Sequence, residues 1–239
     1  MIDIRKTRAR WTVTLDRADK ANALTLDMLT TLADAFEAAR REPDLRLLVI
    51  TGAGDRVFSA GADLGQARDG AAMTTSPYWG RMSRALATLP CLTIAALNGT
   101  LAGGSFGLAV QADLRIAVPH AKFFYPVLKN GFLPQPVDVD RMRALIGPAR
   151  TKLILLGGQK LDAEEALAIG LIDRIVASGE IEPTIAALAE TALTAEQAVL
   201  TAIKRICGQS LDRDMLSDCY RAVYDGDAEA LQRLRAEQS

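Results

Sequence analysis

The pattern of apolar and polar residues predicts strands and helices that alternate over most of the chain. Residues 11–17, WTVTLDR, alternate apolar and polar positions and are rich in β-branched side chains, which predicts a strand. Between Thr25 and Pro43 apolar residues recur every three or four positions, which predicts a helix with Thr25 as its N-cap. Residues 45–52 and 91–99 are continuous apolar runs that end in glycine, as buried strands do. Buried strands repeated between amphipathic helices are typical of a wound α/β fold.

The rest of the chain continues this alternation and then becomes helical. Residues 55–80 are rich in glycine and predict loops, and residues 81–90 predict a short amphipathic helix. Beyond Glu182 strong helix formers dominate. We therefore expect an α/β core over residues 1–180 and a C-terminal helical region over residues 181–239. The remaining core segments are predicted, in chain order, as a helix, two strands, three short helices and a strand: residues 103–112, 113–118, 121–126, 138–147, 148–158, 162–170 and 171–176.

Composition narrows the class of protein. The 239 residues carry a net charge of −1, so the chain has no overall electrostatic attraction for nucleic acid or for an anionic membrane. Its three cysteines, Cys91, Cys207 and Cys219, have neither disulfide-like nor metal-like spacing, which favours a reducing compartment. The first residues lack the apolar core of a signal peptide. We expect a cytoplasmic protein that contacts neither nucleic acid nor membrane.

One short motif suggests a nucleophilic serine. Residues 103–107, GGSFG, match the G-x-S-x-G pattern of a hydrolase nucleophile elbow, with Ser105 as the nucleophile. An elbow needs a strand that runs directly into the serine turn, whereas NGTLA separates the strand from Gly103 here. The serine also needs a general base, and the only histidine, His120, lies in a polar break typical of a turn. A serine hydrolase using Ser105 stays an alternative, beside a small residue packed near a helix start.

The same glycines suit a different chemistry. A helix start presents unpaired backbone N–H groups, and glycine lets a substrate approach that backbone closely. Such a turn can stabilise a developing oxyanion, which usually takes two donors. A second loop of glycine and small residues, FSAGADLGQ at residues 58–66, also follows an apolar strand. The sequence therefore predicts one oxyanion donor from each of the two loops.

These loops, with two further segments, resemble the crotonase superfamily, the enoyl-CoA hydratase/isomerase family. The matching segments are, in order, RADKANALTLDML, VITGAGDRVFSAGADL, IAALNGTLAGGSFGLAVQADLRIA and LLGGQKLDAEEALAIGLIDRIV. They cover most of residues 1–176, and YRAVYDGDAEALQRLRA resembles the C-terminal helices of the family. The resemblance implies a crotonase-like (ClpP/crotonase) spiral of ββα units, an acyl-CoA thioester as substrate and a trimer or a dimer of trimers.

The resemblance also implies the residues of a site. It places the oxyanion donors at the backbone amides of Ala62 and Gly104, and it implies no cofactor beyond the coenzyme A of the substrate and no metal. Asp63 is expected to brace its loop, since loop aspartates commonly bond nearby backbone groups. Arg56 and Arg68 are candidates to reach the CoA phosphates. The substrate contacts implied are Lys20, Ala21, Ala23, Ala60, Ala62, Asp63, Leu64, Gly103, Gly104, Pro126 and Val127.

The chain departs from the family at its acid and base positions. Hydratases of the family carry two glutamates, and the matching positions here are Gly107 and Val127. Asp138 and Asp140 are candidates for a relocated acid, although both also suit the first turn of a helix. Two more candidates are Tyr125, which as a weak acid would face the acyl pocket, and Gln135, which falls where dehalogenase-like members carry a nucleophilic aspartate.

Two functions therefore fit the family resemblance. One is an enzyme that stabilises the enolate of an acyl-CoA without efficient hydration, since both glutamates of a hydratase are missing. The other is a non-catalytic protein that binds acyl-CoA, for which the same absence is the direct explanation.

Overall fold

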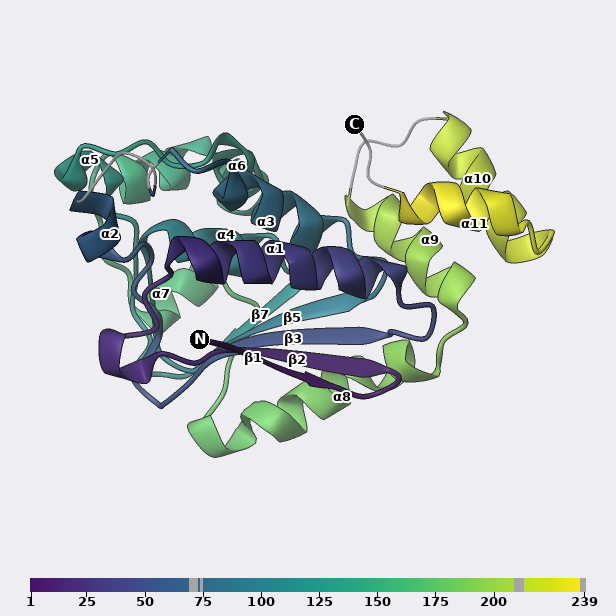
Figure 1. Ribbon diagram of the computed structural model, residues 1–239, viewed down its shortest axis with the longest axis horizontal. Helices are drawn as coiled ribbons and strands as arrows, with labels where there is room; N and C mark the ends of the chain where they lie inside the picture. The colour runs from purple at the N-terminus through teal and green to yellow at the C-terminus, as the bar shows by residue number, and fades with distance from the viewer. Residues whose placement is uncertain (69–72, 74, 209–212, 237–239) are drawn as a thin grey trace.

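The computed structural model describes residues 1–68, 73, 75–208 and 213–236. Within them, six strands form the larger sheet in the order β1–β2–β3–β5–β7–β9 (Figure 1). β1 pairs antiparallel with β2, and every other neighbouring pair is parallel. The bounds are β1 Ile2–Lys6, β2 Arg10–Leu15, β3 Leu47–Gly52, β5 Leu92–Leu97, β7 Leu114–Ala117 and β9 Arg174–Ile175.

A second sheet consists of short parallel strands in the order β4–β6–β8. Each of them directly follows one strand of the larger sheet: β4 follows β3, β6 follows β5 and β8 follows β7. This repeat is the ββ part of the predicted spiral. Because β4, β6 and β8 are parallel neighbours, the three segments that follow them emerge side by side. The bounds are β4 Val57–Ser59, β6 Thr100–Ala102 and β8 Phe123–Phe124.

Helices cover both faces of the larger sheet. α1, Leu26–Arg41, lies on one face, and α8, Ile181–Thr194, crosses the other (Figure 1). The prediction for α1 is confirmed, since Thr25 is its N-cap. The Thr25 side chain accepts a hydrogen bond from the amide of Met28, which has no acceptor within the helix. The other helices of the body are α2 Leu64–Arg68, α3 Pro77–Ala87, α4 Phe106–Val110, α5 Val127–Asn130, α6 Pro136–Leu155 and α7 Ala163–Ala168, with 3₁₀ turns η1 Ala18–Lys20, η2 Gly103–Ser105 and η3 Ser178–Glu180.

The C-terminal helices divide differently from the predicted boundary at residue 180. α8 packs Ile185 and Ala189 against Val49 and Ile94 of the sheet, so it belongs to the body of the fold. The helices that form a separate apolar cluster begin later, with α9 Gln197–Gly208, α10 Arg213–Tyr224 and α11 Ala228–Arg235. They lie at one end of the molecule in Figure 1, away from α2 and α5. α8 covers the sheet because an exposed sheet face of Leu, Val and Ile would otherwise meet water.

The structure adds regular elements to residues 55–80, which the sequence predicts to be rich in loops. β4 lies inside that segment, and α3 begins at Pro77 rather than at residue 81. The Ser76 hydroxyl accepts a hydrogen bond from the amide of Tyr78, and proline suits the first helical position. The two helices predicted at residues 138–147 and 148–158 are confirmed within α6, where they meet at Gly147, whose φ of 76° and ψ of 163° are not helical. Among the described residues, no helix is long and apolar enough to cross a membrane.

Candidate active site

A cavity of about 570 Å³ lies where the three segments after β4, β6 and β8 come together. Gly61 follows β4, Gly103 follows β6 and Tyr125 follows β8. Ligands bind at the carboxyl ends of strands in open α/β folds, because the loops there converge from several strands. The lining residues are Ala60, Ala62, Leu64, Ala102, Gly103, Gly104, Phe124, Tyr125, Pro126, Val127, Lys129, Asn130, Phe132, Gly158 and Lys160.

The two predicted oxyanion amides both border this cavity. Leu24 bridges the loop after β4 by donating to the Gly61 carbonyl at 2.7 Å and accepting from the Asp63 amide at 2.8 Å. That bridge leaves the N–H of Ala62 out of the pairing. Gly104 is the second residue of η2. Backbone N–H groups in the first turn of a helix have no hydrogen-bond acceptor within that helix. Both residues are partly exposed. Ala62 and Gly104 therefore both line the cavity, one from each of the two loops.

Close packing of the two loops depends on glycine. A Cβ on Gly61 would lie 2.7 Å from the carbonyl oxygen of Ala102 and 3.0 Å from the amide nitrogen of Gly104. Gly61 also has a φ of 87°, a left-handed conformation that residues with a Cβ avoid. A Cβ on Gly104 would lie 2.8 Å from the ring of Trp79. The backbones of the two loops are thus in direct contact, which fixes the spacing of their amides.

Buried polar side chains hold the loops in place. The Asn22 amide group donates to the carbonyl oxygens of Ala53 at 3.0 Å and Val57 at 2.9 Å. Asp63 pairs with Arg17 at 2.5 Å and accepts from the amides of Gly65 and Gln66. The Arg17 guanidinium, together with these amides, lowers the pKa of the Asp63 carboxyl below its ordinary value. Asp63 therefore remains ionised and braces its loop, and it does not line the cavity.

The structure contradicts the serine hydrolase reading. Ser105 is fully buried, and its hydroxyl donates to the carbonyl oxygens of Ala102 at 2.6 Å and Ser59 at 3.3 Å. The His120 ring is exposed and bonds to the carbonyl oxygen of Asp55 through Nε2 at 2.7 Å. A nucleophilic serine needs a base within hydrogen-bond reach, and both groups are engaged with separate backbone oxygens. Ser105 stabilises the turn that presents Gly104.

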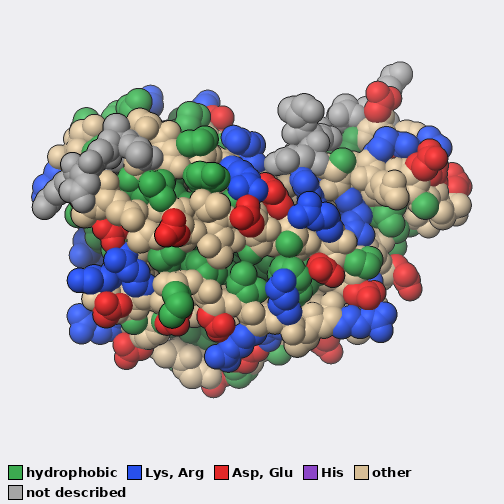
Figure 2. Space-filling view, in the orientation of Figure 1, with side chains coloured by type: hydrophobic (Ala, Val, Ile, Leu, Met, Phe, Trp, Pro, Cys, Tyr) green, Lys and Arg blue, Asp and Glu red, His purple; other side chains and the backbone are tan. Residues whose placement is uncertain are grey.

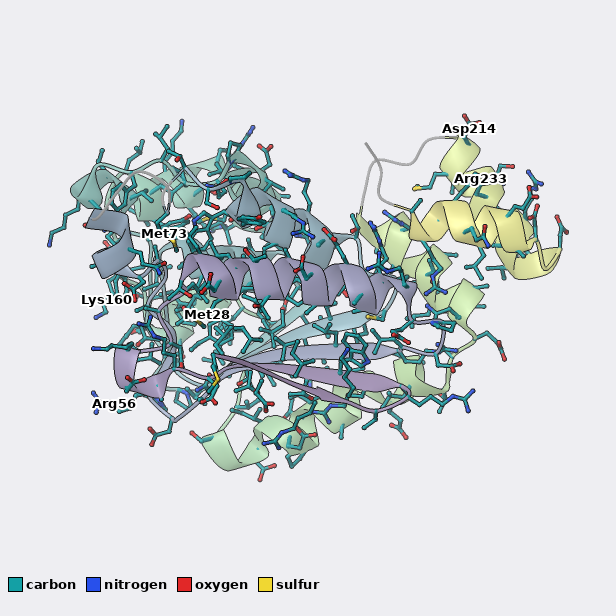
Figure 3. The ribbon with its side chains drawn as sticks, viewed as in Figure 1. Met28, Arg56, Met73, Lys160, Asp214 and Arg233 are labelled. Atoms are coloured by element: carbon teal, nitrogen blue, oxygen red, sulfur yellow. The ribbon has the colours of Figure 1, made fainter. Side chains whose placement is uncertain are left out.

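Some of the other predicted substrate contacts line the cavity, and some do not. Lys20 is exposed at the end of η1, and Ala21 and Ala23 flank Asn22; none of the three lines the cavity. Arg56 is exposed at the same end of the molecule as Lys160 (Figure 3). The side chain of Arg68 lies outside the described residues. The predicted contacts that do line the cavity are Ala60, Ala62, Leu64, Gly103, Gly104, Pro126 and Val127.

Two lysines at the cavity were missed by the sequence reasoning. Lys129 and Lys160 are both exposed and line the cavity, and the Lys160 ammonium lies 5.1 Å from the centre of the Phe124 ring. The sequence carries a signal for both lysines, because each lies close to a position that resembles the family. Lys129 is three residues after Pro126, and Lys160 directly follows LLGGQ. These lysines supply positive charge at a cavity whose other lining residues are mostly apolar or glycine.

Tyr125, the candidate weak acid of the acyl pocket, lines the cavity but is buried. Its side chain is 3% exposed, and its ring stacks on Phe106 with 5.2 Å between the ring centres. Burial raises the pKa of the Tyr125 hydroxyl, and the nearby carboxyl of Asp138 raises it further. The hydroxyl therefore keeps its proton throughout the neutral range.

The two candidate acids on α6 face opposite ways. Asp138 is fully buried, and its Oδ1 accepts from Nε2 of Gln111 at 3.1 Å. Asp140 is exposed, pairs with Arg143 at 3.2 Å and lines a second cavity of about 410 Å³. Burial raises the pKa of the Asp138 carboxyl from 3.8 to about 6. Gln135 is the N-cap residue of α6, and its side chain makes no capping hydrogen bond.

Metal ligands are not gathered in the part of the chain that the structure describes. No group of three or more His, Cys, Asp or Glu side chains there is arranged to hold a metal ion. The described cysteines are unpaired thiols, with Cys91 and Cys219 buried.

The fold and site define an α/β protein in which the glycine-containing loops after β4 and β6 line one cavity. A sequence profile described as enoyl-CoA hydratase/isomerase matches residues 6–227. The chain belongs to the enoyl-CoA hydratase/isomerase family, the crotonase superfamily. Its fold is accordingly the crotonase-like fold that the sequence predicted.

Individual relatives agree with this assignment. The chain is 34% identical over 216 residues to carnitinyl-CoA dehydratase of Salmonella arizonae, covering 90% of this chain and 82% of that protein. It is 31% identical over 204 residues to crotonyl-CoA hydratase of Syntrophomonas wolfei, covering 84% and 78% of the two chains. Among solved structures, enoyl-CoA hydratase from Bacillus anthracis superposes with a TM-score of 0.86 at 25% identity, covering 98% of this chain and 95% of that chain.

Proposed function

We propose that this protein binds an acyl-CoA thioester and stabilises its enolate with the backbone amides of Ala62 and Gly104. When a proton leaves the carbon next to a thioester, negative charge develops on the thioester oxygen. Two fixed N–H donors stabilise that charge, and removal of one such donor from an enzyme costs about 10²–10³ in kcat. The observation that supports the proposal is that Ala62 and Gly104 line one cavity, on loops that contact each other through Gly61.

The charges around the cavity support a thioester with an anionic coenzyme. Lys129 and Lys160 are exposed at the cavity and suit phosphate groups, while Val127 and Phe132 offer an apolar wall to the acyl group. Figure 2 shows acidic and basic side chains mixed over the visible face, without a large area of one sign.

We propose further that the reaction differs from efficient hydration. Addition of water to an enoyl thioester needs carboxyl groups that position and deprotonate the water, and the family positions for them hold Gly107 and Val127. The relatives are named carnitinyl-CoA dehydratase and crotonyl-CoA hydratase, so CoA thioesters of this kind are the compounds with which the proposal is tested.

The test is a panel of acyl-CoA thioesters that includes crotonyl-CoA. Incubation followed by mass spectrometry of retained ligands and of products is expected to show bound thioester and little 3-hydroxybutyryl-CoA. Absence of binding across the panel would contradict the proposed function. Efficient turnover of crotonyl-CoA would contradict only the statement about hydration. Binding without any conversion or proton exchange would instead favour the non-catalytic acyl-CoA-binding protein.

We propose that copies of this chain associate through the C-terminal helices. Ile203 on α9 and Tyr220 and Tyr224 on α10 are large apolar or aromatic residues that are 56%, 62% and 77% exposed. Exposed apolar groups of this size commonly mark protein interfaces. A mass of three or six chains by light scattering is expected, and a monomer at micromolar concentration would contradict the proposal.

A further inference from the structure

The second cavity, of about 410 Å³, lies between the body of the fold and α9. Among the described residues, it shares no lining residue with the candidate active site. The two lie at opposite ends of the segment η2–α4, since Gly104 of η2 lines the active-site cavity and Gln111, the C-cap of α4, lines this one. A ligand here would therefore be separate from the proposed thioester.

Positive side chains converge on this cavity from two helices. α6 contributes Arg141, and α9 contributes Lys204 and Arg205. The Lys204 ammonium already has a counter-charge, because it lies 2.7 Å from Oδ2 of Asp113. Among the described residues, Arg141 and Arg205 form no ion pair. The cavity wall therefore includes two guanidinium groups that no described carboxylate neutralises.

Backbone oxygens orient both arginines without cancelling their charge. Nε of Arg141 donates to the carbonyl oxygen of Val110 at 3.0 Å. Arg205 is 8% exposed, and its Nε and Nη2 donate to the carbonyl oxygens of Leu234 at 2.6 Å and Ala236 at 2.7 Å. A guanidinium group has five N–H donors, so each arginine has more donors than these bonds use. Both are thus fixed cations with donors for a further acceptor.

Positive charges also lie close to one another around the cavity. Burial lowers the pKa of the Arg205 guanidinium, and the charge of Arg40 lowers it further. Burial likewise lowers the pKa of Arg115, and there the charge of Arg141 adds to the effect while Asp173 opposes it. A buried charge without a partner is costly. An anion between Arg141 and Arg205 would offset this cost at both places.

The acidic residues at the cavity have partners of their own. Asp113 accepts from the amide and the hydroxyl of Thr93 as well as from Lys204. Asp140 pairs with Arg143 on the exposed side of α6. Their charges are thus balanced locally, and the net charge that faces the cavity is positive.

We propose that this cavity binds a small phosphate-bearing anion, held by Arg141 and Arg205. The planar guanidinium group matches two oxygens of a phosphate at once, which a single ammonium does not. Leu89, Pro90 and Val137 give the cavity an apolar wall, and its volume admits an organic group attached to the phosphate. Because Arg141 belongs to the body and Arg205 to the C-terminal helices, the anion links the two.

Calorimetry with the full chain tests this site. Inorganic phosphate, adenosine 5′-monophosphate and adenosine are titrated separately at one ionic strength. Both phosphates are expected to bind and adenosine is not, because the arginines recognise the phosphate. Tighter binding of the nucleotide than of inorganic phosphate identifies a phosphate monoester as the ligand class, and equal binding identifies free phosphate.

Arg141→Gln is expected to weaken phosphate binding about 10-fold or more, because charge-assisted hydrogen bonds are lost. Arg150→Gln is the matched control. Arg150 is an exposed arginine of the same helix that does not line the cavity, so its replacement is expected to leave the affinity at the wild-type value.

A pair of substitutions at Ala144 separates charge from shape. Ala144 is exposed on α6 and lines the cavity, so the helix accepts a longer side chain there. Ala144→Glu adds a carboxylate beside the guanidinium groups and is expected to bind phosphate about 10-fold or more weakly than Ala144→Gln, which has the same shape without the charge. This pair also decides the question if Arg141→Gln does not fold.

Three outcomes overturn the proposal. The first is an absence of phosphate binding at millimolar concentration, and the second is equal affinity in Ala144→Glu and Ala144→Gln. The third is wild-type affinity in Arg141→Gln, and loss of binding in Lys160→Gln would then place the phosphate in the candidate active site instead. The proposed function is tested by the thioester panel, so it stands or fails independently of these results.

Discussion

Gly61→Ala is expected to lower thioester α-proton exchange or turnover by about 10²–10³, the effect of losing one oxyanion donor. The new methyl group would lie 2.7 Å from the Ala102 carbonyl oxygen and 3.0 Å from the Gly104 amide nitrogen, so one of the two loops must shift. Either shift misaligns an N–H group with the thioester oxygen. The measurement is the exchange rate or kcat/KM with the acyl-CoA that binds in the panel.

Gly226→Ala is the matched control. Gly226 also has a positive φ, of 66°, but no atom lies within 4 Å of the position that its Cβ would take. Both variants therefore carry the backbone cost of a left-handed alanine, about 1 kcal/mol, and only Gly61→Ala adds the contact between loops. Equal loss of activity in the two variants would assign the effect to backbone strain and count against the oxyanion geometry.

As the pH rises from about 4 to about 8, the free energy of unfolding of Asp138→Asn is expected to increase by about 3 kcal/mol relative to that of the wild-type protein. In the folded protein burial raises the pKa of Asp138 to about 6, whereas the unfolded chain has the ordinary value of 3.8. Between these two values the folded state binds the proton more tightly, so the stability of the wild-type protein falls as pH rises. Asparagine has no proton to lose, and therefore its contribution stays constant.

Chemical denaturation at both ends of that pH range measures the effect. Asp140→Asn is the control, because its carboxyl is exposed and no comparable change with pH is expected. A stability difference between Asp138→Asn and the wild-type protein that stays constant with pH would show that Asp138 has the same pKa in both states.

Local signals account for the elements that the sequence predicted well. The helix after Thr25 combines regular apolar spacing with an N-cap that the structure confirms. The strands at residues 45–52 and 91–99 are mostly apolar because helices cover both faces of the sheet. Short elements without such signals were missed: β4 is three residues long and lies within a glycine-rich segment that reads as loop.

The acids of α6 show where sequence reasoning stops. Asp138 and Asp140 are two positions apart in the first turns of one helix, so their side chains point about 200° apart. One must face inward if the other faces out, but nothing in that segment tells which. The choice is made by Gly107, which leaves room for the Asp138 carboxyl from a helix 31 positions away in the sequence.

By itself, the sequence determined the family, the order of the core elements and the two glycine-containing loops that line the cavity, because each depends on residues close together in the chain. The tertiary structure decided how these parts meet. It placed the loops after β4 and β6 in contact, buried Ser105 beneath the turn and brought Asp138 against Gly107. Such contacts depend on strand pairing and side-chain packing between distant segments, and local patterns of residues carry no direct signal of which distant atoms will touch.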